Sequence, residues 1–145
     1  MIREYREEDL DAVIEIWLNA SVQAHHFVPQ EYLQSQVENM RSIYIPASEV
    51  YVYEADEGTL GFYALHEDAL AAIFVSPNNQ GQGIGKQLLQ HAKAKRSLLT
   101  LCVYKANLAS YQFYISQGFK VVSEQLDHHT KQQEYTMCFE HSIGE

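Results

Sequence analysis

The amino-acid sequence predicts an α/β (α+β) protein with one compact domain over residues 1–145, in the element order βααβββαβαββ. The length suits one ordinary domain, and 46% of the residues are apolar, which is enough to bury a core. Strand-like apolar runs alternate with segments whose apolar residues recur at helical spacing. Neither internal repeats nor low-complexity linkers interrupt this alternation.

The N-terminal third predicts one strand, at residues 1–5, and two helices. In the first helix the residues at helical spacing are Leu10, Val13, Ile14, Trp17 and Ser21. A second helix follows Pro29, a residue that suits a first helical turn, and Pro46 prevents it from continuing. The shared face of this second helix carries Leu33, Val37, Met40 and Tyr44.

The middle of the chain predicts three strands. Residues 49–55 (EVYVYEA) and 59–67 (TLGFYALHE) flank a polar turn, and together they indicate a β-hairpin. A further strand, residues 69–75 (ALAAIFV), leads directly into a glycine-rich segment.

The C-terminal half predicts two helices and three strands. The helix after the glycines has apolar residues at Ile84, Leu88, Leu89 and Ala92. Residues 97–104 (SLLTLCVY) are typical of a strand that is covered on both faces. A helix over residues 108–117 then ends at Gly118, a left-handed C-cap. Two final strands are expected at residues 119–125 (FKVVSEQ) and 133–140 (QEYTMCFE).

The net charge of −9 disfavours nonspecific binding to nucleic acid phosphates and favours a cationic partner. No stretch approaches the roughly 20 apolar residues of a membrane span, and MIREYREEDLD contains no apolar leader segment. We therefore expect a cytoplasmic protein that binds neither nucleic acid nor membranes.

The cysteines and histidines do not predict a metal site. Cys102 and Cys138 lie in strand-like runs without a CxxC pattern, which favours buried, reduced thiols. His128 and His129 lie in a polar loop without further ligand-type residues. We therefore expect no metal.

Three of the seven glycines, Gly81, Gly83 and Gly85, lie where a strand meets a helix. Glycine permits positive φ and a close approach to the backbone. The first amides of a helix lack intrahelical partners and, with the positive end of the helix dipole, bind phosphate oxygens. A flexible turn would explain one glycine, but three in alternation predict a phosphate-binding loop.

Two common nucleotide motifs do not fit this loop. The pattern GxxxxGK[ST] fails because Gln80 stands five residues before Gly85 and Gln87 follows Lys86. The pattern GxGxxG fails because Lys86 stands where its third glycine belongs. A different phosphate ligand is therefore expected.

The hexapeptide Gln80–Gly85 (QGQGIG) resembles the [RQ]xxGx[GA] acyl-CoA loop of the GNAT superfamily of N-acetyltransferases. A second segment, residues 107–119 (NLASYQFYISQGF), matches the superfamily's NxxAxxxYxxxGF except at Ser110, where alanine is usual. The element order is also that of the superfamily over almost the whole chain. The sequence looks most like small single-domain bacterial members of the YiaC/YjaB type, some of which are protein lysine acetyltransferases.

The resemblance implies the GNAT fold, a mixed, mostly antiparallel sheet of about seven strands with helices on both faces. It implies acetyl-CoA as co-substrate and direct attack of an amine on the thioester, with no covalent enzyme intermediate. It also implies CoA-binding residues, which would be Ile73, Val75, Gln80, Gly81, Gln82, Gly83, Ile84, Gly85, Lys86 and Asn107.

The same resemblance assigns the general acid but not the general base. Tyr114 would give a proton to the departing CoA thiolate, and Asn107 would bind CoA, cap the following helix, or both. The glutamate that many members carry before the loop corresponds here to Ala71.

Several groups could replace that glutamate as the base. The alternatives are a carboxylate at Glu67 or Asp68, a histidine at His25 or His26, or a chain of waters. Of these, His25 and Glu67 are our candidates for the acceptor site or base.

The acetyl acceptor is expected to be a primary amine, with a protein lysine side chain as the leading candidate. A small-molecule acetyltransferase acting on a polyamine or an antibiotic is one alternative. A non-catalytic acyl-CoA sensor is another. The final strands do not distinguish a monomer from a homodimer.

Overall fold

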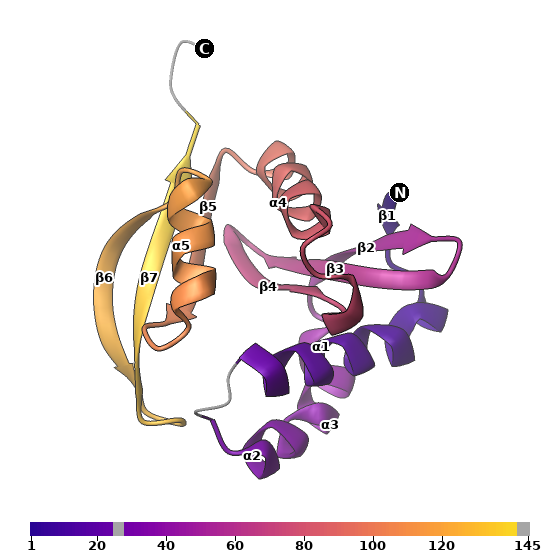
Figure 1. Cartoon of the computed structure of the whole chain (residues 1–145), viewed down its shortest axis with the longest axis horizontal. Coiled ribbons are helices and arrows are strands. Elements are labelled where there is room, and N and C mark those ends of the chain that lie inside the picture. The colour runs from indigo at the N-terminus through magenta and orange to yellow at the C-terminus, as the bar shows by residue number, and fades with distance from the viewer. Residues whose placement is uncertain (25–27, 142–145) are drawn as a thin grey trace.

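The computed structural model describes residues 1–24 and 28–141, which form a seven-stranded sheet in the order β1-β2-β3-β4-β5-β7-β6 (Figure 1). Neighbouring strands are antiparallel except for β4 and β5, which are parallel. The strands are β1 (Ile2–Glu4), β2 (Glu49–Ala55), β3 (Gly58–His66), β4 (Ala69–Val75), β5 (Leu98–Tyr104), β6 (Lys120–Asp127) and β7 (Gln132–Glu140). The predicted fold class and element order are confirmed.

Helices lie on both faces of this sheet (Figure 1). One face carries α1 (Leu10–Ala24), α2 (Gln30–Ser35), α3 (Val37–Asn39) and a π-helical turn (Met40–Tyr44), and the other carries α4 (Ile84–Lys95) and α5 (Leu108–Ser116). Short 3-10 turns occur at Glu7–Asp9 and Pro77–Asn79. The helices of the first face are discontinuous, whereas α4 and α5 are regular.

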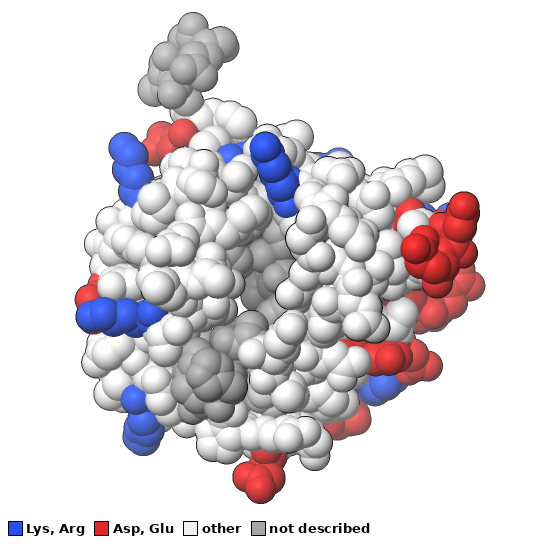
Figure 2. Space-filling model, in the orientation of Figure 1, with Lys and Arg blue, Asp and Glu red and all other residues white. Residues whose placement is uncertain are grey.

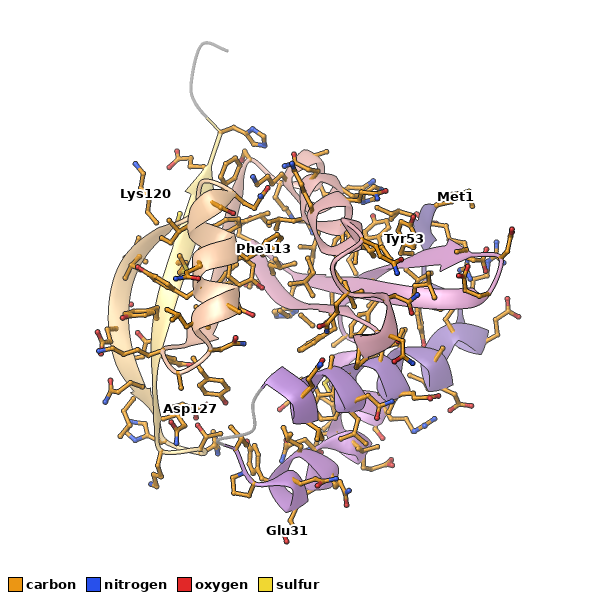
Figure 3. The ribbon with its side chains drawn as sticks, viewed as in Figure 1. Met1, Glu31, Tyr53, Phe113, Lys120 and Asp127 are labelled. Atoms are coloured by element: carbon orange, nitrogen blue, oxygen red, sulfur yellow. The ribbon has the colours of Figure 1, made fainter. Side chains whose placement is uncertain are left out.

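Each face has its own apolar core because successive strand residues point to opposite sides of a sheet. In β2, Val50 and Val52 pack with residues of α1, whereas Tyr51 packs with residues of α4. Phe113 of α5 points toward the core on the α4 side (Figure 3). Side chains in the middle of the sheet therefore reach either the α1 face or the α4–α5 face.

The segment after Pro29 is not the single helix that its spacing predicts. The backbone N–H of Gln36 bonds to the carbonyls of Gln34 and Leu33, which ends α2, and helical bonding then resumes and widens into the π turn. The wider turn alters the angular spacing of the side chains. For this reason Tyr44 is 52% exposed instead of lying on the buried face.

The parallel strands β4 and β5 are joined at their N-terminal ends only. Ala69 pairs with Thr100, and the Thr100 N–H donates a 2.9 Å bond to the Asp68 carbonyl. Along the rest of these two strands, both fully described, no further pair joins them. A β-bulge places Ala71 opposite the step between Ala64 and Leu65 of β3. Because a bulge bends its strand and increases the twist, β4 diverges from β5.

Strand β5 is buried on one face only, so the prediction of a strand covered on both faces is wrong. Leu99, Leu101 and Val103 are buried, whereas Cys102, on the alternate face, is exposed. Cys102 and Tyr104 of this second face line a cavity instead. Both cysteines are free, and Cys138 is half-buried, so the expectation of buried thiols is wrong for Cys102.

A largely buried ionic cluster attaches the N-terminal strand to the rest of the domain. Arg3 makes two bonds to the Asp9 carboxylate, at 2.8 and 2.9 Å, and a third to Glu54 at 3.0 Å. The Arg6 backbone N–H donates to Asp9 at 2.8 Å. Hydrogen bonds from Arg3 lower the pKa of Asp9 despite its burial. The ion pair therefore favours the ionised carboxylate.

Candidate active site

A cavity of about 430 Å³ lies where β4 and β5 diverge. Both strands contribute to its walls, together with residues of α1, α2, α5 and β7. Figure 2 shows the molecule hollowed in this region, while most of the acidic side chains on the visible face lie along its right and lower edges. The cavity is thus a direct consequence of the parted strands.

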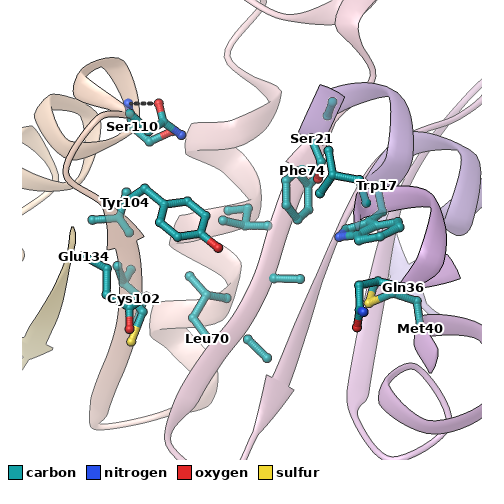
Figure 4. A pocket seen from close by; sticks show the side chains of 18 of the residues that line it. Trp17, Ser21, Gln36, Met40, Leu70, Phe74, Cys102, Tyr104, Ser110 and Glu134 are labelled. Atoms are coloured by element: carbon teal, nitrogen blue, oxygen red, sulfur yellow. Dashed lines mark hydrogen bonds between the residues drawn. The ribbon is translucent and has the colours of Figure 1, made fainter. Parts of the chain in front are cut away.

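The cavity passes from one face of the sheet to the other. Tyr114 of α5 lines it and belongs to the core on the α4–α5 face. Trp17 of α1 also lines it and belongs to the core on the opposite face. In Figure 4, Tyr104 and Glu134 lie on one wall, across the cavity from Trp17. Two ligands could therefore meet inside the sheet after entering from opposite faces.

The glycine loop adjoins the C-terminal end of β4 and leads into α4. Gly81 and Gly83 adopt the positive φ that glycine permits, 80° and 81°, and Gly83 is the N-cap of the helix. A Cβ atom at either position would meet nothing within 4 Å. Backbone conformation, and not crowding, therefore selects glycine here, and the loop backbone stays open to solvent.

The start of α4 presents backbone donors beside this loop. The first intrahelical bond runs from the Gln87 N–H to the Gly83 carbonyl at 3.1 Å, so the amides of Ile84, Gly85 and Lys86 precede it. The positive end of the helix dipole lies at the same place. Lys86 is exposed and adds a cation. This arrangement can bind an anion such as a pyrophosphate.

Gln80 connects the loop back to the strand. Its side-chain Nε2 donates a 3.2 Å hydrogen bond to the Val75 carbonyl. Gln80, Val75 and Ile73 all line the cavity. The predicted CoA-binding residues therefore divide into cavity-wall residues, including Asn107, and the loop that continues from Gly81 to Lys86 beside it.

Tyr114 lies on α5 and reaches the cavity from the α4–α5 face. Its ring packs edge-on against Phe119, with centroids 5.6 Å apart, and its hydroxyl makes no hydrogen bond to any residue that the structure describes. Burial raises the pKa of Tyr114. The helix ends at the predicted left-handed Gly118, with φ 93°. Tyr114 thus presents a protonated hydroxyl group at the cavity.

Asn107 takes the predicted capping position at the start of α5. Its side-chain oxygen accepts a 3.3 Å bond from the Ser110 N–H, which Figure 4 marks with a dashed line. Asn107 is buried and also lines the cavity, as does Ser110. One side chain therefore caps the helix and borders the site.

The far wall of the cavity is formed by β5 and β7, and β6 lies behind them. Tyr104 donates a 2.9 Å hydrogen bond to Oδ2 of Asp127, which lies at the end of β6 (Figure 3). Burial, with the bond to Asp127, raises the pKa of Tyr104 to about 12. Glu134 of β7 is the register partner of Tyr104, and its Oε1 accepts a 3.2 Å bond from Gln125. This wall therefore combines an aromatic ring with a carboxylate.

The predicted alternatives for the general base do not converge on the cavity. Ala71 lines it and is exposed, but supplies no ionisable group. Glu67 and Asp68 are exposed in the turn between β3 and β4 and are not among the residues that line the cavity. His25 and its neighbour His26 lie outside the described residues.

Sequence reasoning missed several cavity-lining residues. The helical spacing of Trp17 and Ser21 predicts only the buried face of a helix, although both border the cavity. Cys102, Tyr104 and Glu134 carried no motif. The alternation of β5 and β7 places these three on one face, but only the parting of β4 shows that this face borders a cavity.

Within residues 1–24 and 28–141, no group of three or more histidine, cysteine and acidic side chains is placed to hold a metal ion. None of the helices in this part of the chain is long and apolar enough to cross a membrane.

The similarities to known proteins agree with the geometry of this site. Residues 46–121 match the family model for the acetyltransferase (GNAT) domain. The chain is 36% identical over 123 residues to the peptidyl-lysine N-acetyltransferase YiaC of Escherichia coli, an alignment that covers 84% of each protein.

Solved structures show the same fold. Apo-form YjaB from Escherichia coli superposes with a TM-score of 0.85 at 26% identity, over 96% of each chain. The PaiA N-acetyltransferase from Thermoplasma acidophilum, solved in complex with coenzyme A, gives a TM-score of 0.79 at 22% identity. That comparison covers 97% of this chain and 98% of the other.

The parted sheet, the glycine loop and these matches define an N-acetyltransferase. The chain belongs to the GNAT family of acetyltransferases.

Proposed function

We propose that this chain transfers the acetyl group of acetyl-CoA directly to a primary amine, the side chain of a lysine in another protein. The cavity that passes through the sheet is the strongest support for this function. A thioester entering from the face of Tyr114 and an amine entering from the face of Trp17 would meet in the gap. Residues 1–145 would act as one N-acetyltransferase domain.

The residues around the gap fit acetyl-CoA, which supplies an activated acetyl thioester when bound. The loop from Gly81 to Lys86 would hold the pyrophosphate through backbone amides and one lysine. Ile73 and Val75 of β4 would offer backbone groups to the pantetheine arm, because these positions have no partner strand on the side of β5. Asn107 would border the same arm.

The chemistry requires three proton transfers. The acceptor ammonium first loses one proton to solvent, and its nitrogen then forms a bond to the thioester carbonyl carbon. As the carbon–sulfur bond breaks, the sulfur takes a proton from the Tyr114 hydroxyl, and the proton lost by the attacking nitrogen restores the tyrosine through solvent. The products are the N-acetyl amine and free CoA. No covalent enzyme intermediate is formed.

Tyr114 suits the role of acid because burial raises its pKa, so the hydroxyl keeps its proton at neutral pH. A positioned acid of this kind contributes about 10²- to 10⁴-fold to a rate. The position of its side chain, lining the cavity between the two strands, supports the same assignment.

A lysine acceptor is supported by the relative and by the cavity. YiaC of Escherichia coli is a peptidyl-lysine N-acetyltransferase. The aromatic side chains of Trp17 and Tyr104 would contact the methylene groups of a lysine, and the net charge of −9 favours a cationic partner. A folded protein could present such a side chain without inserting its backbone.

A thiol-release assay with acetyl-CoA tests the proposal. The acceptor panel contains lysine peptides, N-terminal peptides, polyamines and aminoglycosides, and CoA binding is measured by calorimetry in parallel. Release with lysine peptides, together with mass-spectrometric acetyl-lysine, is the expected result. Release with polyamines or aminoglycosides alone would reject the lysine acceptor. Tight CoA binding without release for any amine would reject catalysis.

A further inference from the structure

Glu134 has a distinctive position in the cavity wall. It lies on β7 directly opposite Tyr104 of β5, half-buried, and its Oε1 is held by the Gln125 amide at 3.2 Å. The same Gln125 amide bonds to the Thr136 hydroxyl at 3.0 Å, which fixes the orientation of the glutamine. The second carboxylate oxygen, Oε2, makes no bond to another described residue. A positioned carboxylate is therefore available to a ligand.

Glu134 also differs in charge from the rest of the wall. Among the described residues that line the cavity, it is the sole acidic side chain, and none is a lysine or an arginine. A carboxylate in a partly buried site interacts strongly with a cation because water screens it poorly. The electrostatic character of this half of the cavity therefore favours a ligand with a positive charge.

We propose that Glu134 binds the ammonium group of the acetyl acceptor and holds its nitrogen in the gap between β4 and β5. This inference rests on the proposed function and names the group that recognises the substrate. The ammonium would donate a hydrogen bond to Oε2 of Glu134 while Gln125 keeps Oε1 in place. The adjoining Tyr104 ring would contact the methylene groups.

The location of Glu134 explains how an acceptor site can exist without a carboxylate at position 71. Ala71 lies on the β4 side of the cavity, at the bulge, and Glu134 lies on the β5–β7 side. Glu67 is exposed in a turn outside the cavity. An amine that approaches from the α1 face thus meets its counter-charge on the wall opposite Ala71.

Glu134→Gln tests this role because it removes the charge and keeps the size of the side chain. We expect the KM for a lysine peptide to rise by at least about tenfold, as for loss of a hydrogen bond to a charged group, while the KM for acetyl-CoA stays at the wild-type value. Glu124→Gln is the matched control. Glu124 lies on the neighbouring strand β6, is exposed, and pairs with Lys105 outside the cavity. An unchanged peptide KM in Glu134→Gln would overturn the inference.

A second measurement uses the wild-type protein and does not depend on the folding of a variant. Calorimetry on the CoA-loaded protein compares a lysine peptide with the same peptide carrying norleucine, which keeps the methylenes and lacks the ammonium. We expect the lysine peptide to bind at least about tenfold more tightly. Equal affinities would overturn the role of Glu134. Wild-type protein that acetylates no amine would instead reject the proposed function, so the two failures are distinguishable.

Discussion

The Tyr104 hydroxyl and the Asp127 carboxylate are joined by a 2.9 Å hydrogen bond that ties the end of β5 to the end of β6. Burial opposes ionisation of Asp127, but bonds from the His129 backbone N–H and from Tyr104 outweigh it and lower the pKa of Asp127. The bond fixes an aromatic ring of the cavity wall. The position of Tyr104 in the cavity wall thus depends on a contact at the end of β6.

Removing that bond should destabilise the fold and raise the pKa of Asp127. We expect Tyr104→Phe to lower the free energy of unfolding by about 1–2 kcal/mol, because a part-buried hydrogen bond to a charged group is lost. The pKa of Asp127 should rise toward its ordinary value of 3.8. Denaturant unfolding and an NMR titration measure the two effects. Tyr53→Phe is the control, since the Tyr53 hydroxyl bonds to no described residue; equal stabilities for the two variants would contradict the prediction.

Loss of the Tyr114 hydroxyl should slow the chemical step. We expect Tyr114→Phe to reduce kcat by about 10²-fold or more with little change in CoA affinity, because the leaving thiolate loses its proton donor. The amount of product formed at fixed reaction times gives the rate. Tyr111→Phe, on the same helix but with its ring against Tyr135, serves as the control. A kcat equal to that of the wild-type enzyme would remove Tyr114 from the mechanism.

The pH dependence of the wild-type enzyme follows from the same residue. Burial raises the pKa of Tyr114 above its ordinary value of 10.0, so the acid form persists at pH values where an exposed tyrosine would ionise. The rate should therefore rise with pH as the acceptor amine loses its proton, without an alkaline decline below pH 10.0. A pH–rate profile that bends downward near pH 9 would assign the acid to another group.

The two kinds of loop glycine should respond differently to alanine. Gly83 has φ 81°, so Gly83→Ala should cost about 1–2 kcal/mol of stability through backbone strain. Gly85 lies within α4, where its Cβ would make an ordinary 3.7 Å contact with Val75, and Gly85→Ala should gain up to about 1 kcal/mol through helix propensity. Denaturant unfolding of both variants gives the comparison. If Gly83→Ala is the more stable of the two variants, the positive φ at position 83 does not require glycine.

The N-terminal ionic cluster should make stability sensitive to acid. The pKa of Asp9 is lowered from 3.8 by Arg3, so its contribution is complete above pH 3.8 and is lost as the pH falls through the lowered value. We expect Asp9→Asn to cost about 2–3 kcal/mol at neutral pH and to reduce the loss of stability in acid. Unfolding curves at several pH values test both effects.

Asp11→Asn provides the comparison for Asp9→Asn. Asp11 pairs with Arg41 at 2.8 Å, but its side chain is 88% exposed, so its removal should change stability by no more than about 1 kcal/mol. Similar losses in the two aspartate variants would show that burial of the Arg3–Asp9 pair is unimportant.

Much of the fold could be predicted because its signals are local. The apolar spacing of Ile84, Leu88 and Leu89 depends on one helix alone, and that helix is present. The break near Gln36 and the bulge at Ala71 could not be predicted, because each is a departure from regular backbone hydrogen bonding that leaves the apolar spacing unchanged. Local periodicity therefore gives the elements but not the distortions that open the cavity.

The candidate site divides in the same way. Gly83 and Tyr114 belong to contiguous motifs, so the sequence alone predicts them as site residues. Glu134 could not be predicted, because its significance depends on the parting of two other strands and on Tyr104 across the register. An alternating strand does not reveal which of its faces borders a cavity.

The single pairing between Ala69 and Thr100 is the one ladder contact that holds the described strands β4 and β5 together. Beyond that rung, the facing backbone groups of β4 and β5 lack a partner strand, so the sheet contains two internal edges. A bound molecule with its own amide groups would form hydrogen bonds to both edges and so connect them. Binding of the co-substrate would then stabilise the centre of the sheet, and release of the product would remove that stabilisation in each catalytic cycle.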